Sequence, residues 1–122
     1  MVVRIKDKER SQGSVTPASL NTETDLINLP DQDDDYIIEG TIDLANMQDG
    51  DTVIIKVYVA VDGTNQRLQD KLTFKDAQEV PVVRITSQTV PYNGKFRVTI
   101  TQTAGGLRSF PYTFIYQIME KI

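Results

Sequence analysis

The run Asp31-Gln32-Asp33-Asp34-Asp35 is the one segment of this chain whose residue types and spacing suggest chemistry. Alternating carboxylates are typical of the start of a calcium loop, in which hard oxygen ligands surround the ion. An EF-hand also requires Gly at its sixth position and Glu at its twelfth, where this chain has Tyr36 and Ile42. The favoured interpretation is therefore a solvated, self-repelling loop.

A calcium site of another kind is the alternative, with ligands from Asp31, Asp33 and Asp35 and a further carboxylate from Asp49 or Asp51. Acid–base catalysis is not expected, because glycosidases hold two carboxyls about 5–10 Å apart across a cleft and not at a loop tip. The chain contains no His and no Cys, which excludes Ser-His-Asp triads, thiol nucleophiles and His or Cys metal ligands. We expect a protein that is not an enzyme and has no cofactor.

The elements around this run follow a period of two residues, which predicts strands. The chain has 122 residues, enough for one domain. The clearest strand covers residues 52–61 and is rich in β-branched residues. One of its faces carries Val53, Ile55, Val57, Val59 and Val61. The other face carries Thr52, Ile54, Lys56, Tyr58 and Ala60.

Seven or eight such strands, separated by turn residues, predict an all-β fold. Their spacing of about 8–12 residues is typical of sandwiches and barrels. We predict an antiparallel two-sheet β-sandwich, jelly-roll-like, with an immunoglobulin-like sandwich as the alternative. The predicted core consists of Ile42, Val53, Ile55, Val57, Val59, Phe96, Val98, Ile100, Phe114 and Tyr116.

Residues 1–22 are predicted to form a flexible N-terminal arm, ahead of a single sandwich domain over residues 23–122. The arm is charged at first and then rich in Ser, Thr, Gly, Pro and Asn. It either frays or becomes ordered against a neighbouring subunit. No signal peptide is expected, and no apolar stretch is long enough to span a membrane.

The charges are distributed unevenly along the chain. Residues 20–65 contain eleven acids and one base, whereas residues 84–122 contain five bases and one acid. Either the two regions are neighbours within one sandwich, or they meet between subunits and orient a contact. The net charge of −4 argues against a nucleic-acid partner.

A second apolar face is predicted on two strands. It consists of Ile54, Tyr58 and Ala60 on the clearest strand and of Ile115 and Met119 on the last strand. Together these residues would form an apolar stripe that a closed homo-oligomer could bury.

A rival interpretation of the sequence is a carbohydrate- or cell-surface-binding module, in which Tyr36, Tyr58 or Tyr92 offers an exposed ring. Tyr58 is the best candidate.

Residues 36–116 carry a resemblance to a group of known proteins. It rests on GTIDLANM at 40–47, GDTVIIKVYV at 50–59, DGTN at 62–65, VPY at 90–92 and TQTAGGLRSFPY at 101–112. These segments resemble small all-β structural proteins, capsid-decorating or tail proteins, of tailed viruses of bacteria and archaea.

The resemblance implies a virion structural protein, made in the host cytoplasm, whose partners are further copies of itself and the major capsid or other virion proteins. A capsid decoration or minor capsid protein is expected. A trimer is expected, because three-fold positions are common docking points on viral shells.

Overall fold

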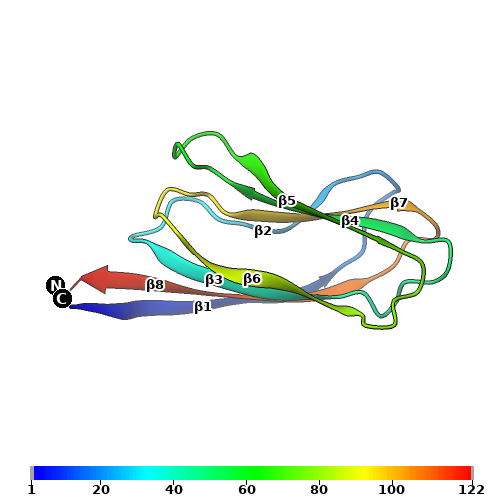
Figure 1. The fold of residues 1–122 in the computed structure, drawn as a ribbon, viewed down its shortest axis with the longest axis horizontal. Coiled ribbons are helices and arrows are strands. Elements are labelled where there is room, and N and C mark those ends of the chain that lie inside the picture. The colour runs from blue at the N-terminus through cyan, green and yellow to red at the C-terminus, as the bar shows by residue number, and fades with distance from the viewer. Residues whose placement is uncertain (1, 122) are drawn as a thin grey trace.

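Eight strands in two antiparallel sheets make up the computed structural model, which describes residues 2–121 (Figure 1). The strands are β1 (Val3–Val15), β2 (Thr24–Asn28), β3 (Tyr36–Asp43), β4 (Thr52–Val59), β5 (Arg67–Lys75), β6 (Val82–Val90), β7 (Arg97–Ala104) and β8 (Phe110–Lys121). Over the described range, no helix has the length and apolarity that a membrane span requires.

The strand order identifies a jelly roll. The first sheet has the order β1-β8-β3-β6 and the second sheet has the order β2-β7-β4-β5, so the first strand pairs with the last. Eight strands divided in this way between two packed sheets form the two Greek keys of a jelly roll. An immunoglobulin-like sandwich instead pairs its first two strands in one sheet. The predicted two-sheet, jelly-roll-like sandwich is confirmed.

The core lies between the two sheets and matches the predicted alternation. Val53, Ile55 and Val57 point inward from β4, while Phe114 points inward from the facing sheet. All the predicted core residues are buried except Tyr116, which is half-buried and packs against the core. Gly40 on β3 lies directly against the Phe114 ring, because a Cβ at this position would overlap with the ring carbons.

The clearest strand ends two residues earlier than predicted. β4 stops at Val59; Ala60 is 1% exposed and Val61 is 89% exposed, which breaks the alternation. The Gly63 amide donates to the Ala60 carbonyl, and the Asp62 carboxylate accepts from the backbone amide of Asn65. A side chain that accepts from the backbone in this way starts a turn, which competes with the extended strand.

The N-terminal segment differs from the flexible arm expected over residues 1–22. Its residues 3–15 form β1, which pairs with β8 of the same chain from Val3↔Lys121 to Val15↔Phe110. The free ends of β1 and β8 project beyond the other strands (Figure 1). Because β1 is held by backbone hydrogen bonds at a sheet edge, it needs no apolar face of its own.

Candidate functional site

The acidic run lies in the loop between β2 and β3, where its carboxylates turn to different partners. Asp31 pairs with Lys95 at 3.2 Å, and Asp33 pairs with Lys6 at 3.0 Å. Asp35 accepts a hydrogen bond from the Tyr92 amide at 2.9 Å. Within residues 2–121, no three acidic, His or Cys side chains are grouped so that they could hold a metal ion. The run ties its loop to β1 and to the β6–β7 connection.

Asp49 and Asp51 lie at the opposite end of β3 from this run, so they do not join it. The Asp51 carboxylate is 1% exposed and accepts from the Arg108 Nε at 2.8 Å and from the Gln48 amide at 2.9 Å. The Arg108 guanidinium is the main reason that the pKa of Asp51 is lowered. A Cβ on Gly105, whose φ is 89°, would overlap with this carboxylate.

Gln102 completes this buried polar cluster beneath the β7–β8 loop. Its side-chain amide donates to the carbonyls of Ala104, at 3.1 Å, and Gly106, while its oxygen accepts from the Arg108 amide at 3.2 Å. Gln102 was not among the residues predicted from the sequence, although it shares the inward register of Val98 and Ile100. A polar residue on a predicted core face signals a buried hydrogen-bonding role. The cluster fixes a loop and offers no reactive group.

A second polar cluster covers part of the outer face of the second sheet. The Glu23 carboxylate accepts from the Tyr58 hydroxyl at 2.5 Å and from the Thr99 hydroxyl at 2.6 Å. Arg97 lies over the Tyr58 ring, 5.1 Å from its centroid, and donates to Asp25 at 2.7 Å. Burial opposes ionisation of Glu23, but its hydrogen bonds from Thr99 and Tyr58 outweigh that effect and lower its pKa.

This cluster occupies the tyrosine favoured for sugar binding. The hydroxyl and one face of the Tyr58 ring are already engaged, and Tyr36 is fully buried. Of the three predicted tyrosines, only Tyr92, at 50% exposed, offers a largely free ring. A single exposed ring is a weak platform for a carbohydrate.

The predicted interface residues do not form one stripe. Ile54 and Tyr58 belong to β4 in the second sheet, whereas Ile115 and Met119 belong to β8 in the first sheet. Outward-pointing residues of two packed sheets lie on opposite sides of a sandwich. Ala60 is buried and is therefore not part of a surface. The two apolar patches must be considered separately.

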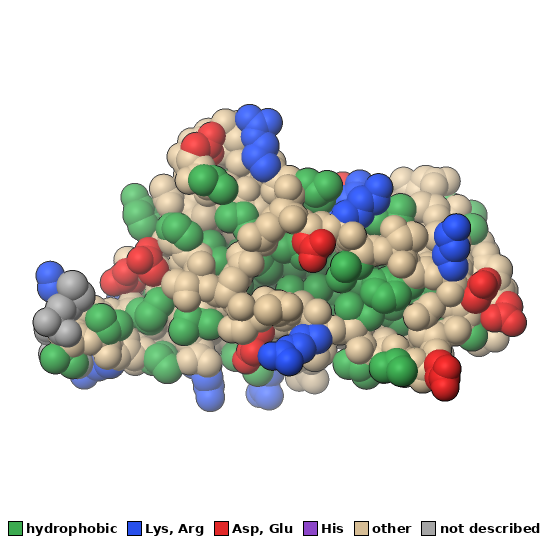
Figure 2. All heavy atoms as spheres, in the orientation of Figure 1, with side chains coloured by type: hydrophobic (Ala, Val, Ile, Leu, Met, Phe, Trp, Pro, Cys, Tyr) green, Lys and Arg blue, Asp and Glu red, His purple; other side chains and the backbone are tan. Residues whose placement is uncertain are grey.

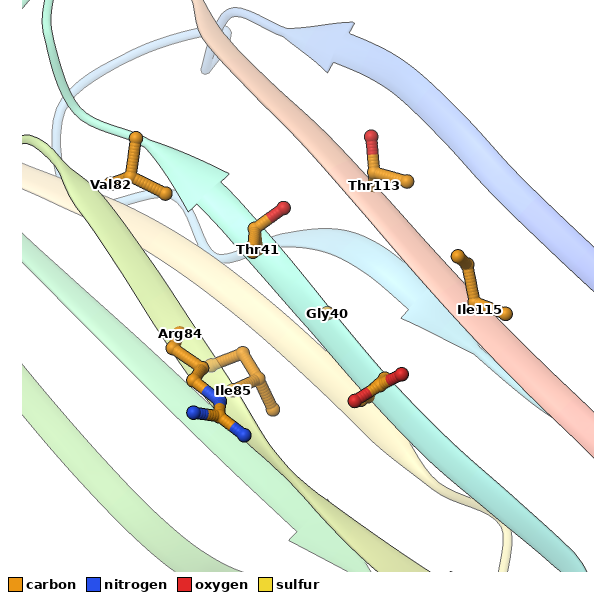
Figure 3. A pocket seen from close by; sticks show the side chains of 8 residues that line it. Gly40, Thr41, Val82, Arg84, Ile85, Thr113 and Ile115 are labelled. Atoms are coloured by element: carbon orange, nitrogen blue, oxygen red, sulfur yellow. The ribbon is translucent and has the colours of Figure 1, made fainter.

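The outer face of the first sheet holds a surface hollow of about 440 Å³. Figure 3 shows Thr41 on β3, Thr113 and Ile115 on β8, and Val82 and Arg84 on β6 around it. A further hollow on this face, about 420 Å³, lies on the other side of Ile115, next to Lys8 and Arg10 of β1. Ile115 thus forms a ridge between two depressions.

The side of the sandwich between β5 and β6 is also open. Figure 2 shows apolar side chains in the gap between the two layers there. A narrower hollow of about 170 Å³ reaches inward past Asp70 and Arg84 to Val57, Leu72 and Phe96. It exposes the edge of the core and contains no cluster of catalytic groups.

The acidic first half and the basic last third of the chain meet within one molecule. Arg97 pairs with Asp25 at 2.7 Å and Arg108 with Asp51 at 2.8 Å, in addition to the pair between Lys95 and Asp31. The interpretation that acidic and basic regions are neighbours in one sandwich is confirmed. These charges are therefore not left over for a contact between subunits.

Comparison with known proteins was informative only at the level of structure. No family model and no curated protein matches this sequence. The fold is similar to that of VP2 in the crystal structure of an infectious bursal disease virus subviral particle, with a TM-score of 0.53 and 13% identity over 95% of this chain. A structure of the Gx strain of the same virus gives a TM-score of 0.50 and 11% identity over 98% of this chain.

The chain spans about a third of the viral chains, 32% of each, so it corresponds to a part of them. At this identity the likeness shows the fold. Both neighbours come from structures of a virus or its subviral particle, and the likeness supports the all-β fold that the resemblance implies. Its assignment to tailed viruses of bacteria and archaea stays a prediction.

Proposed function

We propose that this protein is a non-enzymatic structural component of a virion, a capsid decoration or minor capsid protein that self-associates and docks on the shell. The observation that carries the proposal is the jelly-roll strand order, together with the structural similarity of 95% of the chain to part of VP2 in a virus's subviral particle. The protein is made in the host cytoplasm and acts in the particle. A tailed virus is the proposed source, on the strength of the sequence resemblance.

The polar clusters support a structural role. Asp51, Arg108 and Gln102 hold a loop, and Glu23 is held by Tyr58 and Thr99. Each cluster satisfies its own charges and hydrogen bonds. The arrangement stabilises the fold, and the outer face of the first sheet, away from both clusters, is the surface that we propose for contact with other proteins.

Self-association follows from the outer face of the first sheet. Ile5 and Val82 on this face are each more than half exposed, and Ile115 stands between its hollows. Val82 borders one of these hollows, whereas Ile5 lies at the other end of the sheet, so the proposed contact rests on Ile115, Val82 and the hollows. The self-association expected from the sequence depended on one stripe joining β4 and β8, which the two sheets separate. The trimer was expected on a different ground, the three-fold positions of viral shells. Of the residues in that stripe, only Ile115, on the first sheet, lies beside its hollows, so the number of copies depends on that face.

Binding to particles tests the proposal. Purified protein is added to particles that lack it, and bound protein is measured after sedimentation through a sucrose cushion. We expect saturable binding in a fixed ratio to the major shell protein. Ile115→Arg and Ile54→Arg form a matched pair that tells which outer face docks. Binding that does not saturate, or retention on polysaccharide without binding to particles, would contradict the proposal and favour a carbohydrate-binding module.

A further inference from the structure

The charged residues beside Ile115 form a pattern across the outer face of the first sheet. In the strand register, Ile115 of β8 lies directly opposite Arg10 of β1 on one side and Glu39 of β3 on the other. Directly opposed residues of antiparallel strands point to the same face. One row across this face therefore reads basic, apolar, acidic, with Ile115 at its centre.

Both charges of this row are uncommitted. Neither Arg10 nor Glu39 forms an ion pair with any residue in the described range 2–121. Their neighbours across the sandwich behave differently, since Arg97 and Asp25 on the second sheet pair with each other. Among the described residues, the row thus presents an unpaired cation on β1 and an unpaired anion on β3, with β8 between them.

The hollows on either side of Ile115 give these charges room for a partner. The hollow bounded by Glu39 and Ile115 is also lined by Val82, Thr113 and Arg84 (Figure 3). Arg84 lies on the edge strand β6, outside the row formed by Arg10, Ile115 and Glu39. The second hollow is bounded by Arg10 and Ile115. A matching surface needs an apolar ridge flanked by an acid where this face has a base, and by a base where this face has an acid.

We propose that the surface that meets this requirement is the same face of a second copy. The two first sheets pack face to face around a two-fold axis that runs along β8. Rotation about this axis leaves the position of each residue along the strands unchanged and moves the residue to the opposite side of β8. Ile115 then meets the partner's Ile115, and Arg10 lies over the partner's Glu39, twice in each dimer. The interface is isologous and closed.

The charges select this arrangement from the alternative two-fold. A two-fold axis perpendicular to the strands, along the row, keeps each residue on the same side of β8 and inverts its position along the strands. It therefore places Arg10 on the partner's Arg10 and Glu39 on the partner's Glu39. Like charges facing one another disfavour that complex. Aligned sheets pack with their strands within about 30° of each other, so facing residues match best in the central row, where the two β8 strands cross.

This inference rests on the proposed function, because it gives the self-association a surface and a symmetry. Its test needs only the isolated chain, whereas the proposed function is tested on particles, so each can fail without the other. The molar mass is measured by sedimentation equilibrium over a concentration series. We expect a reversible dimer that weakens at high salt, because salt screens the paired charges.

Charge reversal distinguishes this interface from any other. Arg10→Glu and Glu39→Arg each convert two opposite-charge contacts into like-charge contacts, so each should raise the dimer dissociation constant by at least about tenfold. The double variant Arg10→Glu/Glu39→Arg should restore the dimer. Ile115→Arg should give a monomer, and the control Ile54→Arg, on the second sheet, should leave the dimer intact. Unchanged melting temperatures establish that each variant is folded.

A wild-type monomer throughout the concentration series overturns the proposal, as does a trimer. A dimer that tolerates both single reversals, or that the double variant fails to restore, places the contact elsewhere on the chain. The row Arg10–Ile115–Glu39 is supported only if the singles weaken and the double rescues.

Discussion

Replacing Asp51 by Asn removes the charge from the buried carboxylate under the β7–β8 loop while keeping its size. The new amide side chain would still offer an oxygen to the Gln48 amide, but its bond to Arg108 would lose the attraction between opposite charges. Hydrogen bonds to charged groups contribute about 1.5–3 kcal/mol, roughly twice as much as neutral ones. The Arg108 side chain is 32% exposed, so water screens part of this attraction. We expect the free energy of unfolding to fall by about 1–2 kcal/mol at pH 7.

The pH dependence separates this electrostatic effect from a packing effect. The pKa of Asp51 is lower in the folded than in the unfolded state. Its contribution to the free energy of unfolding is therefore fully present above the unfolded pKa, near 3.9, and is lost as the pH falls through the folded pKa. The Asp51→Asn variant has no such titration. The stability difference between the two proteins should therefore be constant from pH 7 to about 5 and shrink below about 4.

Urea denaturation monitored by circular dichroism measures the difference at each pH. A loss of this size corresponds to a shift of the urea midpoint by about 1 M. Asp49→Asn is the matched control, because Asp49 has no ion pair among residues 2–121 and only a 3.3 Å hydrogen bond from the Ala77 amide. We expect little change in the control. Equal stability of wild type and Asp51→Asn at pH 7, or a difference that persists undiminished to pH 2, would refute this reasoning.

Three further changes test the core and the acidic loop. Val57→Asp should unfold the domain, because an unpaired carboxylate in the core costs several kcal/mol; a far-UV spectrum and melting curve like those of wild type would show that its register is wrong. Gly40→Ala should lower stability by about 1–3 kcal/mol in urea denaturation, since the new methyl group overlaps with the Phe114 ring; no loss would mean that the ring moves freely. A bound calcium ion would stabilise the folded state by mass action and raise the melting temperature. Because no calcium site is expected, calcium should shift the melting temperature little in wild type and in the triple variant Asp33→Asn/Asp34→Asn/Asp35→Asn. A large shift that the variant abolishes would reveal a calcium site at Asp33, Asp34 and Asp35.

The sequence predicts those parts of the fold that depend on local alternation. Residues 53–59 belong to a strand in the middle of a sheet that has one face in the core. Every second residue is therefore apolar, and this alternation can be recognised in the sequence. The same logic could have found Gln102, which occupies an inward position of β7. Tyr36, expected among the exposed rings, is buried instead, and its hydroxyl accepts a hydrogen bond from the Phe96 amide at 3.4 Å.

The remaining features depend on residues far apart in the chain. β1 pairs with β8 across nearly the whole sequence, and backbone hydrogen bonds of this kind leave no pattern in the side chains of Val3–Val15. The sorting of β4 and β8 into different sheets likewise decides that Ile54 and Ile115 face opposite ways. The partners of the acidic run, Lys6 and Lys95, come from β1 and the β6–β7 loop, so only the fold could bring them to it.

The proposed virion role is tested most directly by quantitative mass spectrometry of purified particles, with the copy number of this chain measured against the major shell protein. Particles are purified by density gradient and followed across the peak fractions. We predict that peptides of this chain co-sediment with the shell protein at one fixed ratio in every fraction. Absence of the chain from intact particles, or a ratio that falls with each purification step as a contaminant's does, would contradict a structural role in the virion.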